Sequence, residues 1–160
     1  MILPAHHKKS ILQKKLLHWY SQNKRDLPWR KTSDPYKIWV SEIMLQQTQV
    51  KTVIPYYQKW IAVFPTLTSL ASAPLSKVLK FWAGLGYYRR ARMLHQGAQK
   101  VVKEFKGKVP HSLEALRKIP GVGPYTAGAI ASIAYGQKVP VLDGNIIRIF
   151  TRIFAINQSI

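Results

Sequence analysis

The sequence contains no cysteine, which excludes disulfide bonds, thiolate chemistry and any cysteine-ligated metal cluster from this chain. It also lacks an apolar run approaching the roughly 20 residues of a membrane-spanning helix. Residues 1–10 are polar and basic, which is not typical of a secretory signal. We therefore expect a cytoplasmic protein with no membrane partner.

Acidic residues are scarce. Six Asp and Glu stand against 25 Lys and Arg, and the net charge of +19 is spread along the chain of 160 residues. A domain this basic is expected to bind a polyanion, most commonly nucleic acid. A basic soluble protein that has no such partner is the alternative.

Apolar residues recur at helical spacing through most of the chain, and no segment alternates long enough to predict a strand. The pattern predicts a first helix that begins at Ser10, with Gln13 completing a capping box. A second helix follows Asp34 as N-cap and Pro35. In a third helix, Pro55 suits the first turn better than the middle. The sequence therefore predicts an all-α fold.

Residues 119–127 read Ile-Pro-Gly-Val-Gly-Pro-Tyr-Thr-Ala and lie between two short amphipathic patterns. Pro124 suits the first position of the second helix. Gly121 and Gly123 let the backbone adopt positive φ and let a ligand approach bare amides. Because N–H groups at a helix N-terminus attract anions, this stretch indicates a clamp for one backbone phosphate. An ordinary helical hairpin is the alternative.

Four of the six acids are poor candidates for catalysis, because they suit a helix cap, a basic loop or solvated helix faces: Asp34, Asp26, Glu104 and Glu114. Glu42 has Ile38, Trp39 and Leu45 as helical neighbours, so desolvation should favour its protonated form. Asp143, at a helix N-terminus, should stay ionised. One protonated and one ionised carboxyl could cleave a glycosidic C–N bond. The alternatives are an arginine-paired Glu42 and an Asp143 that only caps a helix.

Five ordered motifs resemble one family. Residues 116–145 resemble the helix-hairpin-helix, Gly/Pro-rich loop and aspartate of the endonuclease III superfamily of DNA glycosylases. The other four resemble its adenine DNA glycosylase (MutY-type) branch: Trp29-Arg30, Asp34-Pro35-Tyr36, SEIMLQQTQV at 41–50 and GLGYYRRAR at 84–92. The resemblance covers about Leu16 to Ile156. It implies a helix-hairpin-helix glycosylase fold, a six-helix barrel plus part of a second helical domain.

The resemblance also implies an activity. Such enzymes remove adenine mispaired with 8-oxoguanine or guanine by hydrolysing the N-glycosidic bond during base excision repair. The implied partner is mismatched double-stranded DNA, and we expect a monomer in the cytoplasm, associated with the nucleoid. Glu42 matches the acid that protonates adenine, and Asp143 matches the carboxylate facing the sugar. Tyr125 replaces the Schiff-base lysine of the bifunctional glycosylases, which implies a monofunctional enzyme.

Other positions match binding residues of the family. The matches to the pocket for the flipped base are Arg25, Leu27, Trp29, Arg30, Leu45 and Val50. Gln47 and Tyr87 match residues that enter the duplex around the opposite purine. Gly121, Val122 and Gly123 match the phosphate-binding hairpin.

The implied domains are an N-terminal helix of the second domain at 1–27, the barrel at 28–137 with the hairpin at 113–135, and an aspartate loop at 138–160 that starts the second domain.

Relatives add a [4Fe–4S] module with four cysteines and a domain that reads 8-oxoguanine. Without cysteine, we expect no cofactor and no metal in this chain. We expect the N-terminal part of a longer or truncated protein, with the first and last helices exposed where the cluster domain packs.

Three alternatives remain open. A thymine or uracil mismatch glycosylase of the same superfamily can also have tyrosine at the position of Tyr125. A fragment that binds DNA with weak or no catalysis is a second possibility. A basic all-α interaction domain that does not bind DNA is the third.

Overall fold

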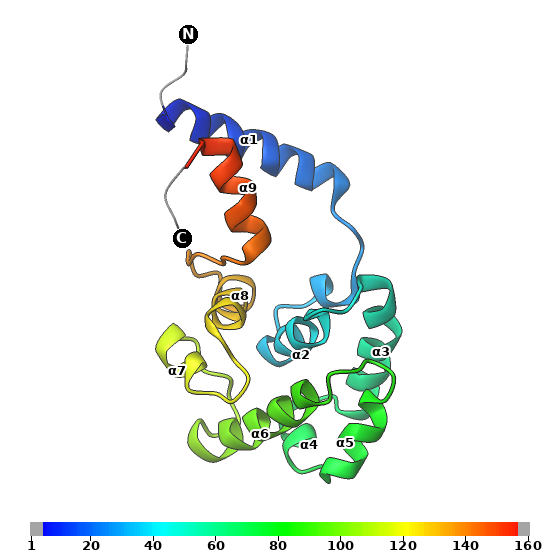
Figure 1. The fold of residues 1–160 in the computed structure, drawn as a ribbon. Coiled ribbons are helices and arrows are strands. Elements are labelled where there is room, and N and C mark those ends of the chain that lie inside the picture. The colour runs from blue at the N-terminus through cyan, green and yellow to red at the C-terminus, as the bar shows by residue number, and fades with distance from the viewer. Residues whose placement is uncertain (1–4, 157–160) are drawn as a thin grey trace. The chain divides into compact units, whose positions relative to one another are not determined.

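The computed structural model describes residues 5–156, with side chains from residue 9 onward, and is helical with no strand in that range (Figure 1). Its elements are α1 (Ala5–Asn23), the 3-10 helix η1 (Pro28–Lys31), α2 (Pro35–Leu45), α3 (Val50–Val63), α4 (Leu67–Ala71), α5 (Leu75–Trp82), α6 (Arg89–Glu104), α7 (Leu113–Arg117), α8 (Pro124–Tyr135) and α9 (Gly144–Phe154). The all-α prediction is confirmed. None of these helices combines the length and apolar character needed to cross a membrane.

The chain divides into two compact units. One comprises Met1–Asp26 and Leu142–Ile160 and contains α1 and α9, and the other comprises Leu27–Val141 and contains η1 and α2 to α8. Residues 1–4 and 157–160, which belong to the predicted second domain, lie outside the described residues.

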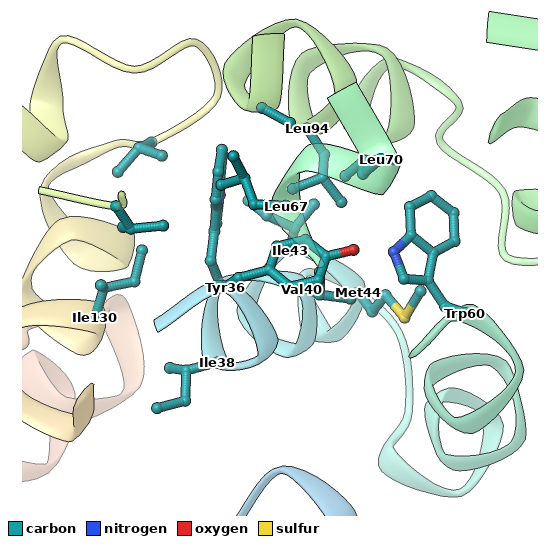
Figure 2. Close-up of a cluster of buried hydrophobic side chains, with 14 of the residues drawn as sticks. Tyr36, Ile38, Val40, Ile43, Met44, Trp60, Leu67, Leu70, Leu94 and Ile130 are labelled. Carbon is teal, nitrogen blue, oxygen red and sulfur yellow. The ribbon is translucent and has the colours of Figure 1, made fainter. Parts of the chain in front are cut away.

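The second unit is built around α2, which contacts η1, α3, α6 and α8. Seven of its eleven residues are buried, so the solvent-exposed face of α2 is narrower than that of an ordinary surface helix. Figure 2 shows its side chains in the core with Trp60 of α3, Leu67 of α4, Leu94 of α6 and Ile130 of α8. Any residue of α2 that is polar therefore lies in or beside the core.

Three predicted helix starts are confirmed. Asp34 accepts a hydrogen bond from the Tyr36 amide at 2.9 Å and caps α2. Pro124 is the first residue of α8. Asp143 accepts a hydrogen bond from the Ile146 amide at 2.7 Å and caps α9. These short polar side chains satisfy N–H groups that a helix start leaves without an intrahelical partner.

Two predicted helix starts are wrong. Ser10 lies inside α1, because the helix already begins at Ala5. Pro55 lies inside α3, because the carbonyl of Gln49 accepts from the Thr52 and Val53 amides and starts that helix earlier. The buried face of α3 spans the proline, so packing outweighs the one backbone hydrogen bond that proline removes. The sequence pattern also did not predict the short helices η1 and α4.

Most of the described apolar side chains of the first and last helices are exposed, as predicted, and the others are half-buried. Among the side chains that the structure describes, neither helix contributes one to the buried core. The large exposed hydrophobic residues in and beside them are Ile11, Leu16, Leu17, Trp19, Tyr20, Leu142, Ile149, Phe150, Ile153 and Ile156.

Gly97 of α6 packs closely against Trp39 of α2. A Cβ placed there would stand 2.7 Å from Trp39 and 2.9 Å from Ile119, which are both buried. Gly97→Ala should therefore lower the free energy of unfolding by about 1–3 kcal/mol, although alanine alone favours a helix by about 1 kcal/mol. Chemical denaturation measures this. Gly144→Ala, whose new methyl group meets no atom within 4 Å, is the matched control, and equal stability of both variants would contradict the packing.

Candidate active site

Glu42 is the acidic residue of α2. It is half-buried, with Ser41 and Ile43 buried on either side of it. Among the described residues, its carboxyl group has no ion pair and no hydrogen bond. Burial raises its pKa from 4.5 to about 7. The cause is desolvation, because removing a carboxylate from water penalises its charged form.

This environment suits a proton donor. The alternative in which Glu42 pairs with an arginine for structure is not observed in the described part of the chain. A carboxyl group with a pKa of about 7 holds a proton in about half of the molecules at neutral pH and can transfer it to a leaving group. Glu42 therefore has the properties of a general acid.

Five of the six residues predicted to receive a flipped base, all except Arg25, belong to the same compact unit as Glu42. Leu45 ends α2 and Val50 begins α3, and both are half-buried. The 3-10 helix η1 contacts α2 and α3, and its Trp29 packs edge-on against Tyr57 with 5.3 Å between ring centroids. Leu27 and Trp29 are 5% and 7% exposed, so they belong mainly to the core, whereas Arg30 is exposed.

Tyr125 is the second residue of α8, the helix that packs against α2. Its side chain is 41% exposed. A phenol has no amine, so this side chain cannot form a Schiff base with a sugar aldehyde.

The hairpin between α7 and α8 has the predicted form, with one correction. Gly121 has φ of +78° and a Cβ there would lie 2.8 Å from the Met93 Cβ, so glycine is required. Gly123 instead has φ of −82°, which any residue adopts, and nothing lies within 4 Å of a Cβ built on it. Its lack of a side chain therefore leaves open space at the start of α8.

Val122 differs from its neighbours in the hairpin. Its side chain is buried, and its amide donates to the carbonyl of Ile119 at 3.1 Å within the turn. The Val122 amide is therefore not available to a bound phosphate, whereas the N–H groups at the start of a helix lack intrahelical acceptors.

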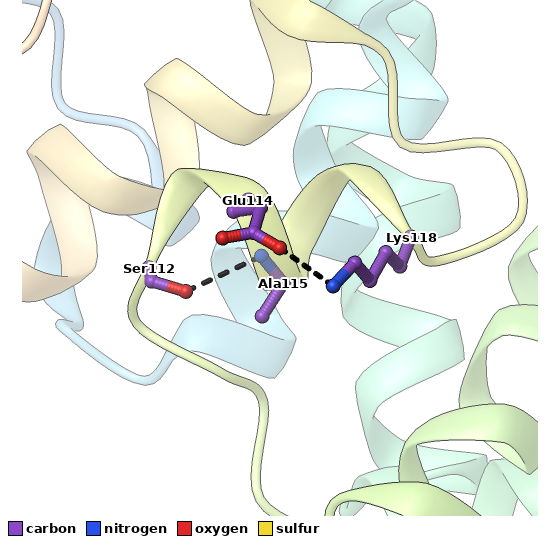
Figure 3. A network of polar contacts seen from close by, with 4 residues as sticks. All are labelled: Ser112, Glu114, Ala115 and Lys118. Carbon is purple, nitrogen blue, oxygen red and sulfur yellow. Dashed lines mark hydrogen bonds and ion pairs between the residues drawn. The ribbon is translucent and has the colours of Figure 1, made fainter.

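The first helix of the hairpin, α7, is held by local polar contacts (Figure 3). Ser112 caps it by accepting from the Ala115 amide at 3.2 Å. Lys118 donates to Glu114 at 2.7 Å, and this hydrogen bond lowers the pKa of the exposed Glu114. The prediction that Glu114 lies on a solvated face is confirmed.

Gln47 and Tyr87, the residues predicted to enter a duplex, are both exposed. Both have left-handed backbone conformations, with φ of 54° and 47°. A positive φ is uncommon for residues other than glycine, and such residues cluster at functional sites.

Arg25 and Asp143 belong to the unit that contains α1 and α9. Arg25 follows α1 in an exposed segment, and Asp143 is half-buried. Capping accounts for one oxygen of Asp143, which accepts from the Ile146 amide. That Glu42 and Asp143 share one site stays a prediction.

The residues of this chain do not fit an iron–sulfur cluster. There is no thiolate donor, because the sequence contains no cysteine. Among the side chains that the structure describes, those of residues 9–156, no three His, Asp or Glu residues are grouped so that they could hold a metal ion.

Residues 40–160 match the HhH-GPD superfamily of base excision DNA repair proteins, and the chain belongs to that superfamily. The fold agrees. A thermostable thymine-DNA glycosylase of known structure superposes with a TM-score of 0.86 at 31% identity, covering 91% of this chain and 68% of that one.

Two similar relatives are adenine DNA glycosylases. The protein of Rattus norvegicus is 55% identical over 159 residues, which cover 94% of this chain and 31% of the rat protein. The protein of Buchnera aphidicola subsp. Baizongia pistaciae is 46% identical over 148 residues, covering 92% and 42%. The chain thus spans less than half the length of these relatives.

Replacement of Glu42 should change how stability depends on pH. Because the pKa of Glu42 is raised in the folded state, the contribution of Glu42 to the free energy of unfolding is fully present below its unfolded pKa of about 4.5. This contribution is lost as the pH rises through about 7. Glu42→Gln removes that loss, so its free energy of unfolding relative to wild type should rise by about 3 kcal/mol between pH 4.5 and pH 8. Denaturant titrations at both pH values measure it.

Glu114→Gln is a control for which the pH dependence should have the opposite sign. The pKa of Glu114 is lowered in the folded state, so the contribution of Glu114 to the free energy of unfolding is lost as the pH falls. A difference between Glu42→Gln and wild type that stays constant with pH would contradict the desolvation of Glu42.

Gly123→Ala should weaken duplex binding without unfolding the hairpin. The added methyl group fits the backbone but occupies the open space at α8. We expect a roughly tenfold loss of affinity, about the value of one hydrogen bond to a charged group. The slope of affinity against salt should not change, because no cation is removed. Fluorescence anisotropy at several salt concentrations measures both, and wild-type affinity would exclude a phosphate contact there.

Proposed function

We propose that this chain is the base-releasing part of a monofunctional adenine DNA glycosylase that acts on adenine opposite 8-oxoguanine or guanine. The observation that carries the proposal is Glu42, a half-buried carboxyl group with no cationic partner among the described residues and a pKa near 7. The net charge of +19 supports duplex DNA as the partner.

In the proposed reaction, Glu42 donates its proton to the adenine as the bond between the base and C1′ of the sugar breaks. The bonding electrons leave with the base, and the sugar becomes an oxocarbenium-like cation. The carboxylate of Asp143 stabilises this cation and orients a water molecule that adds to C1′. The products are free adenine and an abasic sugar.

The other predicted residues have roles in placing the substrate. The first turn of α8 holds a backbone phosphate and so fixes the duplex without reading its sequence. Gln47 and Tyr87 enter the duplex around the opposite purine. The residues that receive the base are Arg25, Leu27, Trp29, Arg30, Leu45 and Val50. Tyr125 stands beside the sugar and leaves hydrolysis by water as the route.

The choice of adenine rests on the relatives. Those with 55% and 46% identity are adenine DNA glycosylases. One observation favours a second candidate, because the thymine-DNA glycosylase of known structure has 31% identity to this chain. A third candidate is a chain that binds DNA without turnover. This candidate stays open because the chain covers only 31% of the length of the rat protein.

Glu42→Gln should abolish base release and leave duplex affinity nearly unchanged. Loss of a general acid costs roughly 10²–10⁴-fold in rate, whereas glutamine preserves the shape and neutral form of the side chain. Single-turnover release from an adenine:8-oxoguanine duplex, with affinity measured in parallel, tests this. Glu104→Gln, on the exposed side of α6, should keep the wild-type rate. Undiminished release by Glu42→Gln would show that the acid is another group.

A panel of four duplexes separates the candidate functions. We expect excision from adenine:8-oxoguanine and adenine:guanine pairs, and none from thymine:guanine or uracil:guanine pairs. Excision of the pyrimidines alone would establish the second candidate. Tight, salt-sensitive binding of all four without release would establish the third, since phosphate contacts displace counterions in either case.

A further inference from the structure

Arg90 of α6 makes an unusual set of contacts. The two terminal nitrogens of its guanidinium group have four N–H groups between them and lie within hydrogen-bonding distance of six acceptors, so some N–H groups are shared. Nη1 donates to the carbonyls of Ile43 (3.1 Å), Met44 (2.9 Å) and Gln46, and Nη2 to the Thr48 hydroxyl (3.1 Å) and the carbonyls of Leu85 (3.1 Å) and Gly86 (3.4 Å). One side chain therefore joins the C-terminal end of α2 and the following turn to the turn before α6.

Each of these two turns contains a strained residue. Gln47 and Tyr87 have positive φ, which side-chain-bearing residues adopt only when their surroundings enforce it. The carbonyls of Gln46 and Gly86 belong to the peptide groups that lead directly into them, and Arg90 binds both carbonyls. Arg90 thus holds the backbone on the N-terminal side of each strained residue.

Aromatic contacts reinforce the second turn. The guanidinium carbon of Arg90 lies 5.6 Å from the ring centroid of Tyr87 and 5.3 Å from that of Trp82. The Trp82 indole also donates to the Gly86 carbonyl at 2.9 Å. Tyr87 is nevertheless 65% exposed, so its ring projects outward while one side of it is near a fixed cation.

Only an arginine can make this junction. The planar guanidinium group directs N–H donors at both turns at once. The ammonium group of a lysine has its donors on one nitrogen atom and so reaches the acceptors of only one turn. The adjacent Arg89 has the same charge but is exposed. It provides a matched comparison one residue away.

We propose that Arg90 is a positioning residue that presets Gln47 and Tyr87 as a rigid pair, so that both enter the duplex together when the base is extruded. The role in extrusion rests on the proposed function, whereas the coupling of the two turns does not. Presetting lowers the cost of ordering the pair at the moment of insertion. Arg90 should thus affect base extrusion more than duplex affinity.

Hydrogen exchange tests the coupling of the turns without DNA. In Arg90→Lys, peptides covering 43–49 and 82–88 should both exchange at least about tenfold faster, because several hydrogen bonds from a charged group are lost. Arg89→Lys should match wild type. Far-ultraviolet circular dichroism should show that both variants are folded. Unchanged exchange in either of the two segments would overturn the coupling.

A duplex with 2-aminopurine, a fluorescent adenine analogue, in place of the mispaired adenine tests the role in extrusion. Arg90→Lys should slow the fluorescence rise at least about tenfold, which is the minimum expected when hydrogen bonds from a charged group are lost. The affinity of Arg90→Lys for the duplex should stay within about threefold of that of Arg89→Lys. Combining Arg90→Lys with Tyr87→Ala should add little further slowing, since two residues that act as a unit are not additive.

The outcomes are distinguishable. Two results would overturn the positioning role. One is that Arg90→Lys extrudes the base at the same rate as Arg89→Lys. The other is that the slowing in the double variant equals the product of the slowing by Arg90→Lys and the slowing by Tyr87→Ala. A wild-type chain that extrudes no base would overturn the proposed function and the extrusion role together. The exchange measurement decides the coupling of the turns in every case.

Discussion

Desolvation of one carboxyl group is the constraint on which the rest of the site depends. Glu42 lies on a helix that is otherwise almost entirely core, and among the described residues no cation or hydrogen-bond donor compensates its charge. A folded chain normally avoids such an arrangement, because an unpaired buried charge destabilises it. Here the cost appears as a pKa raised to about 7. The same physical effect that weakens the fold above that pH provides a proton donor near neutrality.

The rest of the second unit keeps α2 in this environment. Core residues from α3, α4, α6 and α8 surround it, and close approach at Gly97 brings α6 against Trp39. At its C-terminal end, carbonyls that lack intrahelical partners accept hydrogen bonds from Arg90. The acid and the turn with Gln47 are therefore fixed by one helix. The proposed general acid and the proposed inserting residue Gln47 thus share a rigid support, which a precise site requires.

Much of this could be predicted from sequence because the signals are local. The caps at Asp34 and Asp143, Pro124 as first residue of α8, and the apolar neighbours of Glu42 all depend on residues a few positions apart. Where tertiary packing decides, the predictions were wrong or absent. The buried face of α3 carries the helix past Pro55, and Gly123 serves by its empty space rather than by positive φ. The sequence pattern did not distinguish Arg90 from Arg89, because four of the six acceptors of Arg90 lie 42 to 47 residues away.

The most direct test is the titration of Glu42 itself. The chain contains three glutamates, so labelling their side-chain carboxyl carbons with ¹³C gives three resonances, and Glu42→Gln identifies one of them. We expect this resonance to titrate with a midpoint near pH 7. A midpoint near the ordinary glutamate value of about 4.5 would contradict the proposed role, because Glu42 would then be ionised at neutral pH and could not donate the proton.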